Sequence, residues 1–180
     1  PAQFLDSCLH DSRLAKIESA IKETYNPNGM ISYSVPWLDK AKIFENSVDF
    51  LLSQAVLEHV DDIQQTYEAM FCWMRSSGFI SHQIDLKSHG LSVQWNGHWK
   101  KNDFVWKIIR GGRKYLINRL PCSEHVQQCQ GAGFSIVLKS PKKKPNSIRR
   151  SRLARRFRHL SQEDLETCSL FIQARKSESN

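Results

Sequence analysis

Four side chains that could transfer a proton follow two apolar segments of this chain. Glu58 and His59 come shortly after the first segment, and Asp85 and His89 lie at and just beyond the end of the second. Histidine is a natural general base because its pKa is near neutral, and a carboxylate can orient or assist it. We predict His59 and His89 as catalytic bases assisted by Glu58 or Asp85. The alternative for each of the four is a purely structural role.

The first apolar segment, residues 48–52, is interrupted only by Asp49. Its length and hydrophobicity predict a strand that is covered on both faces, as in a parallel sheet. Asp61 and Asp62 can then cap a helix that runs to Arg75. Ligands collect at the carboxyl ends of the strands in open parallel sheets, so the polar residues between this strand and this helix are candidates for a binding site.

Further elements are predicted on both sides of this segment. Residues 79–86 alternate apolar and polar side chains, which indicates a second strand. Two later strands are predicted at 134–138 and 169–174. Before the first apolar segment, the spacing of apolar residues in 4–24 predicts a helix. Residues 30–35 are predicted to form a strand.

The residues LEHVDD at 57–62 resemble the segment after the fourth strand of class I S-adenosylmethionine-dependent methyltransferases. The resemblance continues through SSGF at 76–79, which is similar to the turn before strand five in that family. It extends more weakly to NRL at 118–120 and GAGF at 131–134. The resemblance implies an α/β fold with a Rossmann-like class I methyltransferase sheet, in the strand order 3-2-1-4-5-7-6.

The glycine-rich loop of that family is not visible in this chain. Gly29 is the only glycine before Gly78, and no strands one and two can be recognised. We therefore predict a single partial methyltransferase domain over residues 1–180 that lacks the N-terminal strands one and two. Strands next to the missing ones would have unpaired edges.

The resemblance implies S-adenosylmethionine as the cofactor. Ser53 and Gln54, at the end of the fourth strand, would border its methionine end, and Ser34 and Val35 would flank the adenine. The sulfonium is already an activated methyl donor, so the protein must align a nucleophile and, for a hydroxyl, remove its proton. We expect methyl transfer to a hydroxyl of a small-molecule, saccharide or lipid-linked acceptor.

The segment 87–120 is predicted to be an insertion on the acceptor side. It holds three of the five tryptophans, and aromatic and hydrogen-bonding side chains could together form an acceptor pocket. The alternative is that the tryptophans only pack a lid onto the domain. The predicted acceptor-binding residues are Trp95, Asn96, His98, Trp99, Asn118 and Arg119.

A metal site is not expected from the sequence. The O-methyltransferases of ubiquinone biosynthesis resemble this segment but have a further glutamate three residues before the LEHV glutamate, and the resulting Glu, Glu and His are proposed to hold a divalent ion. Ala55 occupies that position here. Glu58 and His59 alone would be a poor site for a hard cation, so we predict no metal.

The net charge of +8 comes from one segment. Residues 139–158, predicted as the connection before the last strand, hold ten of the 26 basic residues and no acidic one. The segment 148–160 could form a helix with Leu153 and Phe157 directed inward. A solvated connection, an anionic acceptor and acidic lipid headgroups remain open as explanations. We do not expect nucleic acid, because the chain contains no recognition motif.

The composition gives no support for a membrane-spanning or a disulfide-rich protein. No apolar run approaches the roughly 20 residues that span a bilayer, although peripheral membrane contact stays open. The five scattered cysteines contain no CxxC pair, which favours a reducing cytoplasm over a disulfide framework. Two alternatives to an active enzyme remain: a noncatalytic, truncated methyltransferase domain that binds a partner through the basic segment, and a nucleic-acid binder.

Overall fold

The computed structural model describes residues 2–23, 26, 29–34, 43–146 and 148–177. The chain divides into two compact units, Pro1–Lys42 and Ile43–Asn180, where the sequence predicted one domain. The first unit contains helices α1 (Ala2–Cys8) and α2 (Asp11–Lys22), and α2 buries none of its residues.

Two predictions for the first unit are wrong. The single helix predicted over 4–24 is two helices, because the ring of His10 caps α2 by accepting a hydrogen bond from the backbone N–H of Ser12 at 3.3 Å. The strand predicted at 30–35 is absent from the described residues 30–34, for which no strand pairing exists within the described chain. Val35 lies outside the described residues.

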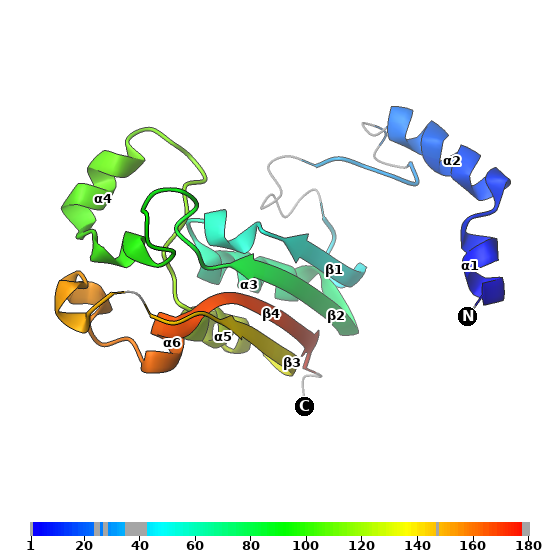
Figure 1. Cartoon of the computed structure of the whole chain (residues 1–180). Helices are drawn as coiled ribbons and strands as arrows, with labels where there is room; N and C mark the ends of the chain where they lie inside the picture. Colours follow the sequence, from blue (N-terminus) through cyan, green and yellow to red (C-terminus); the bar gives the residue numbers. More distant parts are fainter. Residues whose placement is uncertain (1, 24–25, 27–28, 35–42, 147, 178–180) are drawn as a thin grey trace. The chain divides into compact units, whose positions relative to one another are not determined.

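The second unit is built on a four-stranded sheet (Figure 1). Its strands are β1 (Val48–Gln54), β2 (Met74–Asp85), β3 (Phe134–Lys143) and β4 (Thr167–Lys176), in the spatial order β1-β2-β4-β3. The first pair is parallel and the other two pairs are antiparallel. This order is that of strands 4-5-7-6 in the predicted sheet, so the predicted fold class is confirmed.

β1 is an edge strand of this sheet among the residues that the structure describes. The prediction that both faces of β1 are covered is wrong for the described residues, since Phe50 is 55% and Leu52 67% exposed. On this open face Phe50 stacks on Phe79 of β2, with ring centroids 6.3 Å apart.

Helices α3 (Ile63–Trp73) and α5 (Cys122–Gly131) cover the other face of the sheet. Asp62 caps α3 by accepting a hydrogen bond from the backbone N–H of Gln65 at 2.9 Å, which confirms the predicted start of this helix. The buried residues of α3 recur at helical spacing and pack on the sheet; Tyr67, for example, contacts His82 of β2 edge to face. Among the described residues, no helix combines the length and apolar composition that a membrane crossing requires.

The segment between β3 and β4 differs from its prediction. β3 continues to Lys143, and residues 148–160 form two short 3₁₀ turns, η3 (Arg150–Arg152) and η4 (Arg155–Phe157), in place of a helix. Leu153 and Phe157 do point inward, where they join a buried cluster around Trp99. A continuous helix would place arginines three and four residues apart on one face, which is repulsive, whereas the turns bury the apolar residues and separate the charges.

Candidate functional site

The four predicted catalytic residues lie together at the carboxyl ends of β1 and β2. Glu58 and His59 belong to the 3₁₀ turn η1 (Leu57–His59) after β1, Asp85 ends β2, and His89 follows in the next loop. Ala55 turns the chain from β1 into η1 with a positive φ of 52°, and its N–H bonds the carbonyl of Gln83 at 2.8 Å. The parallel pairing of the two strands therefore brings the segments that follow them to one edge of the sheet.

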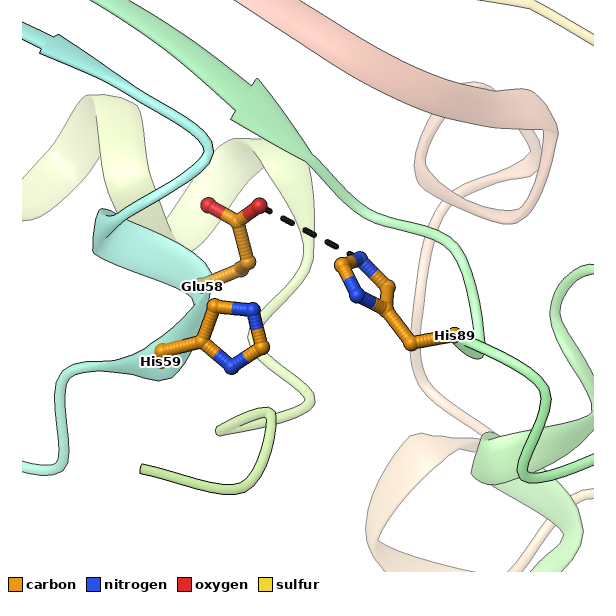
Figure 2. A group of neighbouring side chains, drawn as sticks. All are labelled: Glu58, His59 and His89. Atoms are coloured by element: carbon orange, nitrogen blue, oxygen red, sulfur yellow. Dashed lines mark ion pairs between the residues drawn. The ribbon is translucent and has the colours of Figure 1, made fainter.

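Glu58, His59 and His89 form a compact cluster (Figure 2). One nitrogen of each imidazole and one carboxylate oxygen lie within 4.8 Å of one another. Nε2 of His89 is 4.0 Å from Oε1 of Glu58, and the two rings meet edge to face with centroids 5.1 Å apart. Three potential proton acceptors therefore share one small region.

Glu58 is the buried member of this cluster. Its residue surface is only 2% exposed, and neither carboxylate oxygen has a hydrogen-bond partner among the described residues. Burial raises the pKa of this carboxyl above its usual value, while the nearby backbone N–H groups of Glu58 and Asp85, which lie outside hydrogen-bonding geometry, and the two neighbouring histidines act in the opposite direction. A buried carboxylate without partners is unfavourable, so the site favours either a proton or a cation at Glu58.

His59 is held in one orientation by a backbone contact. Its Nδ1 lies 2.7 Å from the carbonyl oxygen of Tyr115, and since a carbonyl can only accept, Nδ1 is the donor. In the neutral ring, Nε2 then carries the free lone pair. This nitrogen can accept a proton or bind a metal ion.

Asp85 is bonded mainly to Lys87. Its Oδ1 accepts the backbone N–H of Lys87 at 3.0 Å, and its Oδ2 lies 2.8 Å from Lys87 Nζ and 3.7 Å from Nε2 of His89. The hydrogen bond to Asp85 raises the pKa of Lys87. His89, whose side chain is 29% exposed, adopts a left-handed φ of 47° that brings the ring toward Glu58. Asp85 therefore places a negative charge beside Nε2 of His89.

Two of the predicted acceptor-binding residues, Asn118 and Arg119, make hydrogen bonds within the protein. Asn118 donates from Nδ2 to the carbonyls of Leu57 and Val60 at 2.8 and 2.9 Å, which holds η1 in place. Arg119 is buried, lies 4.4 Å from the Trp106 ring and pairs with Asp103 at 2.8 Å. The predicted acceptor role of both is corrected to a structural one, because the side-chain amide of Asn118 and both terminal nitrogens of Arg119 are bonded within the protein, although Nε of Arg119 has no partner among the described residues.

The predicted aromatic pocket is also corrected. Trp99 and Asn96 are fully buried, and Trp99 donates from Nε1 to the carbonyl of Arg119 at 2.9 Å. Trp95 donates from Nε1 to the carbonyl of Pro145 at 3.1 Å. These side chains pack residues 87–120 onto the segment between β3 and β4, which is the alternative that the sequence left open. His98 differs, because it borders a cavity of about 10 Å³ that Glu58, Asp85 and Asn118 also line.

The predicted cofactor residues belong to both units of the chain. Gln54 is exposed at the end of β1, and the hydroxyl of Ser53 is 2.7 Å from Nδ1 of His82. Ser34 belongs to the first unit and Val35 lies outside the described residues. The sequence analysis missed His82, although it is the residue that pairs with Ser53 across the parallel strands. Aligning the two predicted strands would have indicated this neighbour.

Comparisons with known proteins agree with the fold. No family profile and no curated sequence matches the chain. A SAM-dependent methyltransferase structure from Methanosarcina mazei matches with a TM-score of 0.55 and 12% identity over 91% of this chain and 78% of its own. One from Mesorhizobium loti matches with a TM-score of 0.52 and 16% identity, over 93% and 77%.

A structure from Galdieria sulphuraria, provisionally named a sarcosine dimethylglycine methyltransferase, gives a TM-score of 0.53 at 12% identity; the match covers 92% of this chain but only 65% of that one. Together these similarities show that the chain has the class I methyltransferase fold.

Proposed function

We propose that this chain carries the acceptor side of an S-adenosylmethionine-dependent methyltransferase that acts on a hydroxyl group. The observation behind the proposal is the convergence of Glu58, His59 and His89 at the carboxyl ends of β1 and β2. In open α/β sheets this edge is where ligands bind. The solved structures of similar fold are SAM-dependent methyltransferases, which supports this class of reaction.

Each residue of the cluster has a distinct proposed role. His89 accepts the proton of the acceptor hydroxyl, because its ring is partly exposed while its Nε2 lies 3.7 Å from Asp85. Asp85 stabilises the imidazolium that forms, and Lys87 keeps this carboxylate in place. His59, fixed by the Tyr115 carbonyl, offers Nε2 as a second acceptor for hydrogen bonding.

The described residues that could contact the cofactor lie at the end of β1 and would face its methionine end. Gln54 at the end of β1 is exposed and would contact the methionine end, while Ser53 is engaged by His82 and would act through the backbone. When bound, S-adenosylmethionine supplies a methyl group already activated for transfer. No described residues form a glycine-rich loop beside β1.

The acceptor class proposed is a small molecule, saccharide or lipid-linked alcohol. A pocket of about 230 Å³ lies beside η2 (Gly97–Lys100), lined by Gln94, Lys100, Ile148, Arg149 and Arg152. Its three cations and lack of acidic lining residues favour an anionic group on the ligand. The same pocket supports the second candidate function, a noncatalytic domain that binds an acidic partner through the basic segment.

Calorimetric titration with S-adenosylhomocysteine tests the proposal. The 180-residue chain and a chain extended upstream by the residues its gene encodes are titrated side by side. Binding by either, together with methyl transfer to an alcohol that His89→Asn abolishes, is the expected result. Failure of both chains to bind would reject the enzyme and favour the noncatalytic function. Binding of nucleic acid that weakens steeply with salt would instead support the nucleic-acid alternative.

A further inference from the structure

We propose that Glu58, His59 and His89 form a binding site for a divalent transition-metal ion. The three residues come from two separate segments, the η1 turn and the loop after β2, and point toward one another (Figure 2). Each offers one ligand atom, and these atoms all lie within 4.8 Å of one another. The metal-binding inference rests on this geometry, and its role in catalysis rests on the proposed function.

The spacing of the ligand atoms is close to that of a bound site. With metal–ligand distances of about 2.0–2.1 Å, tetrahedral ligand atoms lie roughly 3.3 Å apart. The His89 Nε2 to Glu58 Oε1 distance of 4.0 Å exceeds this by about 0.7 Å, and the 4.8 Å limit over all three ligand atoms exceeds it by about 1.5 Å. His89 lies on a loop and its side chain is 29% exposed, so its ring can move toward the two η1 residues when an ion binds.

Glu58 provides an independent indication of a missing cation. Its side chain is 3% exposed, and both of its oxygens lack hydrogen-bond partners in the described part of the chain. Buried carboxylates in proteins are normally hydrogen-bonded, paired or bound to metal. At 4.0 Å, His89 is too distant for a hydrogen bond, so a metal ion between the three residues would satisfy a group that the protein itself leaves unsatisfied.

The surroundings of His59 resemble the outer shell of a metal site. Histidine ligands commonly donate their second ring N–H to a carbonyl or carboxylate, which fixes the tautomer that binds metal. His59 does this through Nδ1 to the Tyr115 carbonyl at 2.7 Å, leaving Nε2 for the ion. Oδ2 of Asp85 lies 3.7 Å from the same Nε2 of His89 and is held by Lys87, so this carboxylate adds negative charge beside the ion.

The ligand types indicate which ion binds. Two imidazoles and one carboxylate are typical of Zn²⁺, Co²⁺ or a similar borderline ion, whereas Mg²⁺ and Ca²⁺ prefer all-oxygen sites. Three protein ligands leave at least one position open. With the ion bound, Nε2 of His89 would be a ligand instead of the base; a hydroxyl bound at the open position would lose its proton at lower pH, to Asp85 or to solvent, which is the activation that an O-methyltransferase requires.

The third ligand is not a sequence neighbour of Glu58 and His59. Ala55, three positions before Glu58, has no side-chain atom that can bind a metal ion. The fold supplies a third donor from 30 residues further along the chain, at His89. Replacing an oxygen ligand by an imidazole also changes the preferred ion from hard to borderline.

Titration of the reduced 180-residue chain with Co²⁺ tests the proposal, followed by visible absorption and by calorimetry. We expect one ion to bind per chain with the spectrum of nitrogen and oxygen ligands and no thiolate band. Glu58→Gln and His89→Asn should each weaken binding by at least about 10-fold; asparagine tolerates the positive φ at residue 89. His159→Asn, which changes an exposed histidine outside the cluster, should bind as the parent does.

The controls separate this inference from the proposed function. Far-ultraviolet circular dichroism must show that each variant is folded, and only folded variants are compared. No saturable binding, or binding that neither cluster variant weakens, would overturn the metal site. Because the assay contains neither cofactor nor acceptor, a chain that binds Co²⁺ at this cluster but never S-adenosylhomocysteine would overturn the proposed function and leave the metal site standing.

Discussion

Acidification from pH 7.5 to 5.5 should destabilise this protein through three buried histidines. His82 and His125 are 0% exposed and His98 is 2% exposed. Neither ring nitrogen of His125, and only one of His82, has a hydrogen-bond partner among the described residues. Burial lowers the pKa of His82 to about 4 and those of His98 and His125 to about 3.

The direction of the effect follows from which state binds protons. The pKa of each histidine in the unfolded chain is about 6.5, so above that pH the three rings are neutral in both states and stability is independent of them. Below it the unfolded chain takes up three protons that the folded chain does not. The free energy of unfolding therefore decreases as the pH is lowered. At pH 5.5 each histidine has reduced it by about 1.4 kcal/mol relative to its value above pH 6.5.

Glu58 opposes this change in part. Its raised pKa means that the folded protein takes up a proton before the unfolded chain does, which adds stability as the pH falls. The three histidines alone give an expected loss of about 4 kcal/mol between pH 7.5 and 5.5, and Glu58 makes the net loss smaller. This is a large part of the roughly 5–15 kcal/mol typical of a domain.

Urea unfolding at the two pH values, followed by tryptophan fluorescence, measures this loss. His125→Leu removes one buried ring and should reduce the loss by about 1.4 kcal/mol, whereas His159→Gln, at an exposed position, should leave it unchanged. The Glu58→Gln protein, free of the opposing proton, should show the full effect. A loss below about 1.5 kcal/mol in that variant would mean that at least two of the three rings accept protons in the folded state, and would refute the reasoning.

Three further substitutions test the packing that positions the site. Gly78→Ala should cost about 1–3 kcal/mol in urea unfolding, because a Cβ would lie 2.8 Å from the carbonyl of Arg75 and 3.2 Å from that of Val48; unchanged stability would contradict the close approach. Phe157→Ala should lower stability by about 3–5 kcal/mol, since its buried ring packs on Trp99 and beneath Arg119; thermal unfolding monitored by circular dichroism would detect this, and a change under about 1 kcal/mol would argue against the cluster. Asn118→Ala removes two hydrogen bonds to the η1 turn and should lower stability by about 1–3 kcal/mol. Hydrogen exchange at the backbone amides of residues 57–60 should become faster. Unaltered exchange would show that other contacts hold η1.

The parts of the fold that sequence reasoning predicted are those with local signals. β1 and β2 were found from apolar runs and alternation, and the start of α3 from Asp62. The strand order came from the resemblance carried by residues 57–62, since periodicity alone does not order strands. The predicted helix at 148–160 was wrong because inward positions of Leu153 and Phe157 are equally compatible with two short turns.

The sequence predicted which residues form the candidate site and at which edge of the sheet they lie, but not the contacts between them. Glu58, His59, Asp85 and His89 were chosen because polar groups after parallel strands meet at one edge, and the structure brings them together. Trp99 and Asn96 were misassigned to a pocket because hydrogen-bonding groups between rings predict a ligand site and a packed interior equally well. A ligand site and a packed interior can be distinguished only when the residues that contact these side chains are known.

The amino-acid sequence by itself determined the elements around the site, because caps, turns and hydrophobic periodicity act over a few residues. It also determined which chemical groups follow each strand. The tertiary structure alone decided that His89 stands beside Glu58 and that Asn118 holds the η1 turn, because these contacts join segments 31 and about 60 residues apart. Burial, and with it the raised pKa of Glu58, depends on those distant contacts, so the chemistry of the site exists only in the folded chain.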